Sequence, residues 1–144
     1  MAYSRITQFL LVTIGAAALA AGADEPCEVS LVRVVANPAE FDQASVRLTG
    51  VLSVSHDHGF GLYLDVGSYE ARILINALQV ELWQQDVNEL ACFEGKWTTV
   101  EGRFEAIDSR LESLFSGEVR DVTALVAEGC GVLEIGIEEA SEHP

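Results

Sequence analysis

Two stretches of this chain alternate apolar and polar residues, and each has a glycine in its interior. In SVRLTGVLSVS, apolar side chains at alternate positions from Val46 to Val54 fall on one side, with Gly50 among them. KWTTVEGRF, residues 96–104, repeats the pattern around Gly102. A period of two is typical of a half-buried strand, and an interior glycine marks a bulge or a sharp bend. Strands that bend in this way curl a sheet into a barrel.

Three further strands are predicted on the same grounds. GLYLDV (residues 61–66) alternates, a turn follows at Gly67-Ser68, and ARILIN (residues 71–76) forms the next short strand. SLFSGEVRDV (residues 113–122) is the fifth strand.

Two helices complete the pattern. Residues 28–36 place Leu31, Val34 and Val35 on one helical face before Asn37-Pro38 ends the run, although the many valines leave a strand open as an alternative. In residues 78–90, apolar side chains recur at intervals of three to five residues, which favours a helix.

A helix, three strands, a helix and two strands predict a mainly β fold, an OB-fold-like barrel of five strands, over residues 24–128. A meander packed on a loose helix pair is the alternative. Residues 129–144 form either an acidic tail or an extra edge strand.

Residues 1–23 are expected to be a signal peptide. Arg5 precedes an apolar run, Phe9–Ala21, interrupted only by Thr13. The run is shorter than the ~20 residues that a membrane-spanning helix needs. Ala21-Gly22-Ala23 offers a cleavage site that leaves Asp24 first, Ala18-Leu19-Ala20 offers another, and an uncleaved anchor is the alternative. The mature chain is therefore expected in the periplasm or secreted, with no membrane span.

Cleavage after residue 23 leaves a strongly acidic protein. It removes one of eight basic residues and none of 23 acidic ones, so that the net charge becomes 7 − 23 = −16. A surface of this charge repels phosphate backbones, which makes nucleic acid an unlikely partner.

The mature chain keeps three cysteines, Cys27, Cys92 and Cys130. Outside the cytoplasm an odd count permits one intramolecular disulfide and one remaining thiol, and all three pairings are possible. Their spacing fits no zinc or C-x-x-C motif.

His56-Asp57-His58 is the one segment with the donor chemistry of a metal site. Imidazole and carboxylate suit zinc, copper or nickel, but a stable site needs about four ligands, and Asp65, Glu70 or another loop would have to supply the rest. The glycines that follow favour a simple turn. His143 lies near the end of the chain and is not expected to be a ligand.

No motif indicates catalysis or a nucleotide cofactor, so neither enzymatic activity nor a cofactor is expected. Binding is indicated instead by aromatic side chains on different predicted strands, namely Tyr63, Trp97 and Phe115. Core packing also explains Phe115 and Trp97. Tyr63 alternates with apolar residues, so it is expected to face outward and to line a shallow groove with Asp65 and Arg72.

The segments VSLVRVVANPAEFDQASVRLTGVL, GLYL, GKWTTVEGRF and SLFSGEVRDVTAL resemble a group of small bacterial OB-fold-like proteins, some with export signals. The resemblance runs from about Val29 to Leu125. Gln43-Ala44 departs from it, because relatives typically have Gly-Lys after the aspartate. The resemblance implies the fold and an exported location, and it implies no activity. Together these features predict an exported binding module for a protein, peptide or small molecule; a metal-binding module that uses residues 56–58 is the alternative.

Overall fold

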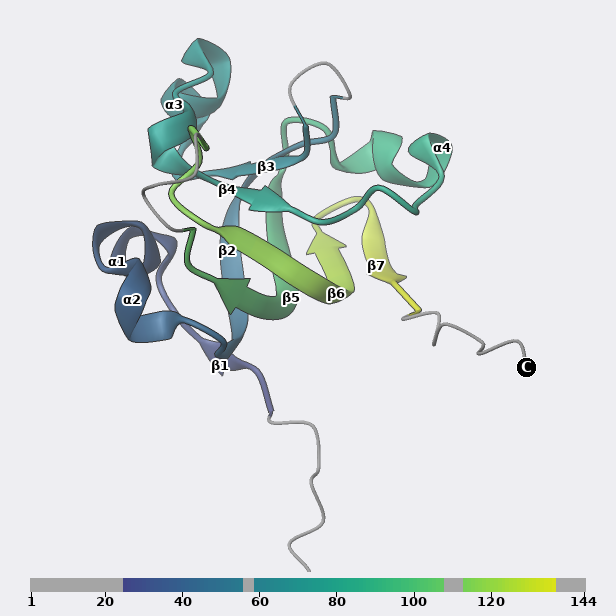
Figure 1. The fold of residues 1–144 in the computed structure, drawn as a ribbon. Helices are drawn as coiled ribbons and strands as arrows, with labels where there is room; N and C mark the ends of the chain where they lie inside the picture. The colour runs from purple at the N-terminus through teal and green to yellow at the C-terminus, as the bar shows by residue number, and fades with distance from the viewer. Residues whose placement is uncertain (1–24, 56–58, 108–112, 137–144) are drawn as a thin grey trace, which may run out of the picture.

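The computed structural model describes residues 25–55, 59–107 and 113–136, and five of its strands close into a barrel (Figure 1). The barrel strands are β2 (Ser45–Ser53), β3 (Gly61–Tyr63), β4 (Ala77–Val80), β5 (Trp97–Glu105) and β6 (Glu118–Ala127). They pair in the order β2-β3-β4-β6-β5, and β5 pairs again with β2. The β4–β6 pair is parallel and the others are antiparallel. This is an OB-fold-like barrel, so the predicted fold class is confirmed.

Two short strands extend the barrel sheet. β1 (Cys27–Glu28) runs parallel to β2, and β7 (Gly131–Glu134) runs antiparallel to β6. Leu133 and Ile135 in and after β7 pack against the core. Part of the segment 129–144 therefore forms an extra strand.

Short helices surround the barrel (Figure 1). They are α1 (Leu31–Ala36), α2 (Pro38–Phe41), α3 (Val66–Ala71) and α4 (Val87–Leu90), with 3-10 turns η1 (Leu74–Asn76) and η2 (Ala91–Phe93). α1 buries Leu31 and Val34, as its helical spacing predicts. Between the third and fourth barrel strands, α4 and η2 insert Leu90 and Phe93 into the core.

Both strand glycines lie where the backbones of two strands come close together. A Cβ atom on Gly50 would lie 2.5 Å from the carbonyl oxygen of Tyr63, and one on Gly102 would lie 2.7 Å from that of Arg120. Opposite Gly102, the β5–β6 register shifts at a bulge, and Asp121 has a left-handed φ of 48°. The glycines thus allow the close approach that bends and closes the sheet.

Between residues 66 and 90 the predicted elements are wrong. The predicted third strand, residues 71–76, is the end of α3 followed by η1, and the strand is Ala77–Val80. The predicted helix at 78–90 shrinks to Val87–Leu90. Leu78, Val80 and Leu82 are all buried, which is a period of two that the wider apolar spacing obscured. Residues 66–71 form a helix where the sequence predicts the end of a strand and a turn.

The fifth strand begins five residues later than predicted, at Glu118. Val119 and Val122 both point into the core, three residues apart, because the bulge at Asp121 lies between them. No single alternation therefore describes the whole strand.

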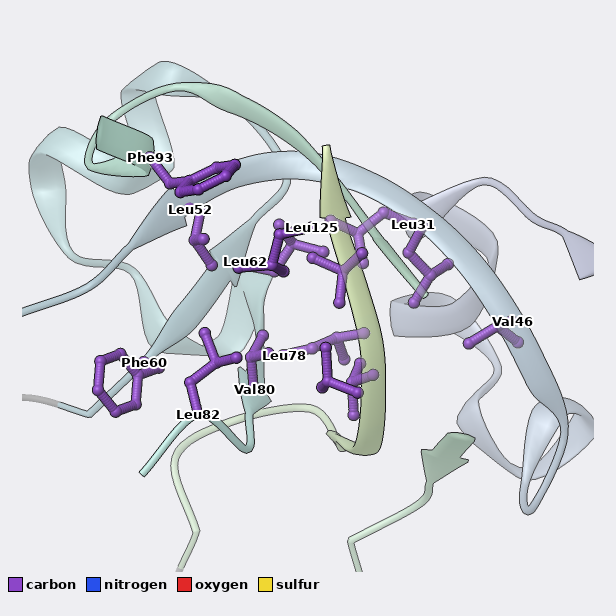
Figure 2. Close-up of a cluster of buried hydrophobic side chains, with 14 of the residues drawn as sticks. Leu31, Val46, Leu52, Phe60, Leu62, Leu78, Val80, Leu82, Phe93 and Leu125 are labelled. Atoms are coloured by element: carbon purple, nitrogen blue, oxygen red, sulfur yellow. The ribbon is translucent and has the colours of Figure 1, made fainter. Parts of the chain in front are cut away.

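Inside the barrel, apolar side chains extend from Phe60 and Phe93 at one end to Leu31 and Val46 at the other (Figure 2).

Candidate functional site

One row of side chains crosses the outer face of the barrel. Trp97, Val51, Tyr63 and Ala77 are neighbours on β5, β2, β3 and β4. This is the kind of face on which OB proteins stack ligands. Here the middle of the row is covered by the chain itself, because Tyr69, Leu74 and Phe115 pack on it.

Tyr63 points away from the barrel interior, as expected, but it is only 1% exposed, so it does not line an open groove. The ring of Tyr69 in α3 meets it edge to face, with 5.8 Å between ring centroids. Burial raises the pKa of Tyr63, and the charge and hydrogen bond of Arg72 oppose part of that rise. Tyr63 therefore supports α3 instead of offering a platform to a ligand.

A carboxylate fastens α3 to the barrel end. Glu94 accepts hydrogen bonds from the Tyr69 hydroxyl, at 2.8 Å, and from the backbone N–H of Val54. The hydrogen bond to Glu94, followed by burial, raises the pKa of Tyr69. The contact joins α3, the residue after η2 and the end of β2, three segments far apart in the sequence.

Asp65 and Arg72 mark the two ends of α3. The Asp65 carboxylate accepts a hydrogen bond from the N–H of Ser68, at 2.7 Å, and so caps the first turn. Arg72 ends the helix in the left-handed conformation with φ of 53°. This places Asp65 in a structural role, whereas Arg72 reaches an open surface.

An open groove of about 620 Å³ lies beside Arg72. Its walls come from α1 and α2, from the segment after α3, and from the β5–β6 connection; they are formed by Val35, Pro38, Arg72, Leu74, Ile75, Ile107 and Ser113–Ser116. We call these residues the Arg72 groove. Ser116 joins two walls, because its hydroxyl donates to the carbonyl oxygen of Ile75 and its N–H to that of Ala77.

The Arg72 groove combines exposed apolar side chains with one cation. Ile75 and Leu114 are 68% and 71% exposed. Among the residues that the structure describes, Arg72 forms no ion pair, whereas the other arginines there all contact carboxylates: Arg33, Arg47, Arg103 and Arg120. The groove can therefore hold an apolar group next to a negative charge.

The remaining predicted residues lie apart from the groove. Trp97 is 53% exposed at the end of the outer row and does not line the Arg72 groove. His56, Asp57 and His58 lie outside the described residues, so their metal site stays a prediction. Within residues 25–55, 59–107 and 113–136, no three His, Cys, Asp or Glu side chains group as metal ligands do.

Sequence reasoning missed most of the Arg72 groove. The sequence predicts strands over residues 71–76 and 113–122, whereas Ile75 lies in η1 and Leu114 lies before β6. The sequence offers one local signal, the apolar residues Ile73-Leu74-Ile75 directly after Arg72, but the same pattern fits a core-facing strand.

The cysteines form one disulfide, Cys92–Cys130, with a sequence separation of 38 residues. Cys27 is free and exposed. The predicted combination of one bridge and one remaining thiol is confirmed, and the structure selects the pairing.

Comparisons with protein-family models, with curated proteins and with solved structures found no match to this chain. Within the described part of the chain, no helix combines the length and the apolar character needed to cross a membrane.

Proposed function

We propose that this chain is an exported, non-enzymatic binding module whose Arg72 groove takes an extended protein segment with apolar side chains and an acidic group. The observation that carries this proposal is the pairing of Ile75 and Leu114, both mostly exposed, with an arginine that has no carboxylate partner among the described residues.

Apolar exposure supports a partner for this surface. Burying an aliphatic side chain of this size is worth roughly 1.5–3 kcal/mol. Ile75 and Leu114 therefore expose apolar area at the groove, and a partner that buries this area gains binding free energy.

The shape of the groove supports a protein segment over a small molecule. Small-molecule sites are usually deep enough to enclose 70–90% or more of a drug-sized ligand. This groove is open to solvent and does not enclose its contents. A segment of a larger partner gains additional contact area outside such a groove, whereas a small molecule does not.

Charge supports an acidic group near Arg72 and argues against a second copy of the chain. The chain has a net charge of −15, so two copies repel each other over most of their surfaces. A carboxylate placed at Arg72 meets the one described arginine whose charge is not already paired.

Export is supported by the leader-like residues 1–23 and by the Cys92–Cys130 disulfide, since disulfides persist in oxidising compartments. Localising a tagged full-length chain by fractionation tests this part separately.

Selection of random dodecapeptides on the purified chain that begins at Asp24 tests the groove. We expect enriched peptides to combine apolar residues with Asp or Glu. Ile75→Glu and Leu114→Glu should each weaken binding by about tenfold or more, as interface hot spots do. Arg72→Gln should weaken acidic peptides more than their amide-substituted versions.

Val132→Glu is the matched control, because Val132 is 64% exposed on β7 and does not line the groove. Failure to enrich any peptide, or equal losses in Val132→Glu and Leu114→Glu, would rule out the groove as the binding site.

A further inference from the structure

The Cys92–Cys130 disulfide has an ammonium group beside it. Lys96 Nζ lies 3.4 Å from the sulfur of Cys130 and 3.7 Å from that of Cys92. Lys96 is the only lysine in the 144 residues. The single ammonium side chain of a strongly acidic protein thus contacts two sulfur atoms.

Hydrogen bonds of the Lys96 backbone fix the position of this residue. Its N–H donates to the carbonyl oxygen of Phe93 at 3.1 Å, and its own carbonyl oxygen accepts from the N–H of Leu52 and the hydroxyl of Thr98, both at 3.0 Å. Within the described ranges, its ammonium forms no ion pair with a carboxylate. The positive charge of Lys96 is therefore available to stabilise a thiolate that forms at either sulfur.

The two cysteine residues differ in exposure. Cys92 is exposed in η2, whereas Cys130 is half-buried in the turn between β6 and β7 and packs against the core. An incoming nucleophile therefore reaches Cys92 more easily. The sulfur that would then be released, Cys130, is the one nearer to Lys96.

We propose that this disulfide is a site of thiol–disulfide exchange with low-molecular-weight thiols. The thiolate of the small molecule attacks Cys92 Sγ, a new disulfide forms there, and the bond to Cys130 breaks. Cys130 Sγ leaves with the electron pair as a thiolate beside the Lys96 ammonium. One disulfide is consumed and one is formed, so no further oxidant or reductant enters the step.

Lys96 accelerates this step because a nearby positive charge stabilises the leaving thiolate, and a better-stabilised leaving thiolate departs faster. Opening the bond releases the β6–β7 turn from η2. Neither cysteine belongs to the paired residues of the five barrel strands, so the barrel remains closed. The exchange is thus a modification of the folded protein.

The initial rate of mixed-disulfide formation with 2-mercaptoethanol tests the proposal. The protein carries Cys27→Ser, so that only the bridge reacts, and free thiols are alkylated after an early acid quench. Mass spectrometry should find the 2-mercaptoethanol adduct on Cys92 and the alkyl group on Cys130. Lys96→Gln should slow the reaction about tenfold, and Lys96→Arg should restore most of the rate.

Arg33→Gln is the matched control, because it also removes one positive charge but lies in α1, where its partner is Glu40. Its rate should stay within about twofold of the parent. Equal rates in Lys96→Gln and Arg33→Gln, or an adduct mainly on Cys130, would overturn the proposal. Both outcomes are independent of peptide binding in the Arg72 groove.

Discussion

Tyr69 contacts the Tyr63 ring and the Glu94 carboxylate. Its ring packs on the buried ring of Tyr63, and its hydroxyl donates to Glu94 at 2.8 Å. Both the hydrogen bond and burial favour the neutral phenol, which is why the pKa of Tyr69 is raised from 10.0. The Tyr69 side chain thereby connects α3 to the end of the barrel where Glu94 lies.

The raised pKa of Tyr69 predicts a loss of stability at alkaline pH. A raised pKa in the folded state means that its contribution is fully present below pH 10 and is lost as the pH rises through the folded-state pKa. Tyr69→Phe should lower the free energy of unfolding at pH 7 by about 1 kcal/mol and flatten the decline above pH 10. Urea unfolding at pH 7 measures the first effect, and urea unfolding at several pH values between 8 and 11 measures the second.

Tyr63→Phe is the comparison, because burial also raises the pKa of Tyr63. It should flatten the same decline while keeping the Tyr69–Glu94 hydrogen bond. A decline that is unchanged in both variants would show that other groups cause it.

At the scale of the elements, β2 and β5 depend on their glycines for curvature. The missing side chain at Gly50 leaves room for the Tyr63 backbone and the Leu31 side chain, and the one at Gly102 leaves room for the β6 bulge. The positions are comparable because each close contact involves a carbonyl oxygen, which cannot rotate away as a flexible side chain can.

Gly50→Ala and Gly102→Ala should each lower the free energy of unfolding by about 2–3 kcal/mol, since a Cβ atom would overpack the strand crossing. Gly136→Ala is the control, because a Cβ atom there meets no atom within 4 Å. Urea unfolding compares the three. A loss below 0.5 kcal/mol in both strand variants, within the usual range of surface substitutions, would contradict the bending role.

The elements between β3 and β4 show how tertiary contacts override a local pattern. Asp65 caps α3, and Asn76 donates to the Ser68 hydroxyl at 3.2 Å, so residues 65–76 fold back over the sheet. The alternating Ile73 and Ile75 resemble one face of a strand, yet both are exposed. These two apolar side chains therefore lie at the surface. The alternation alone cannot distinguish such an exposed segment from a strand that faces the core.

At the scale of the whole molecule, charge opposes compactness. The chain carries 23 acidic and 8 basic residues, and self-repulsion of this kind destabilises a compact state. Cross-strand ion pairs such as Arg47–Glu101, at 2.6 Å, offset only a little of it, because partly exposed pairs contribute about 1 kcal/mol or less.

Added salt should therefore stabilise the protein. Raising NaCl from about 0.02 M to about 0.5 M shortens the screening length and should raise the urea midpoint. Glu128→Gln removes one exposed acid without a described ion pair, so it should be slightly stabilising at low salt and neutral at high salt. A midpoint that falls with salt would show that the ion pairs outweigh the repulsion.

Much of the barrel could be predicted because its evidence is local. The alternation around Gly50 and Gly102 locates two full strands, and the spacing in residues 31–36 locates α1. The candidate site could not be predicted in the same way, apart from Arg72. The Arg72 groove joins residues from near 35, 74 and 114, which only the folded chain brings together.

The sequence by itself determined the curved strands, the negative net charge and the number of cysteines available for a bridge, because each depends on residue type or on short-range period. Only the tertiary structure decided which cysteines pair, that Tyr63 is covered by α3, and that Lys96 lies on the disulfide. These features arise from contacts between segments distant in the chain, and closure of the barrel sets those contacts.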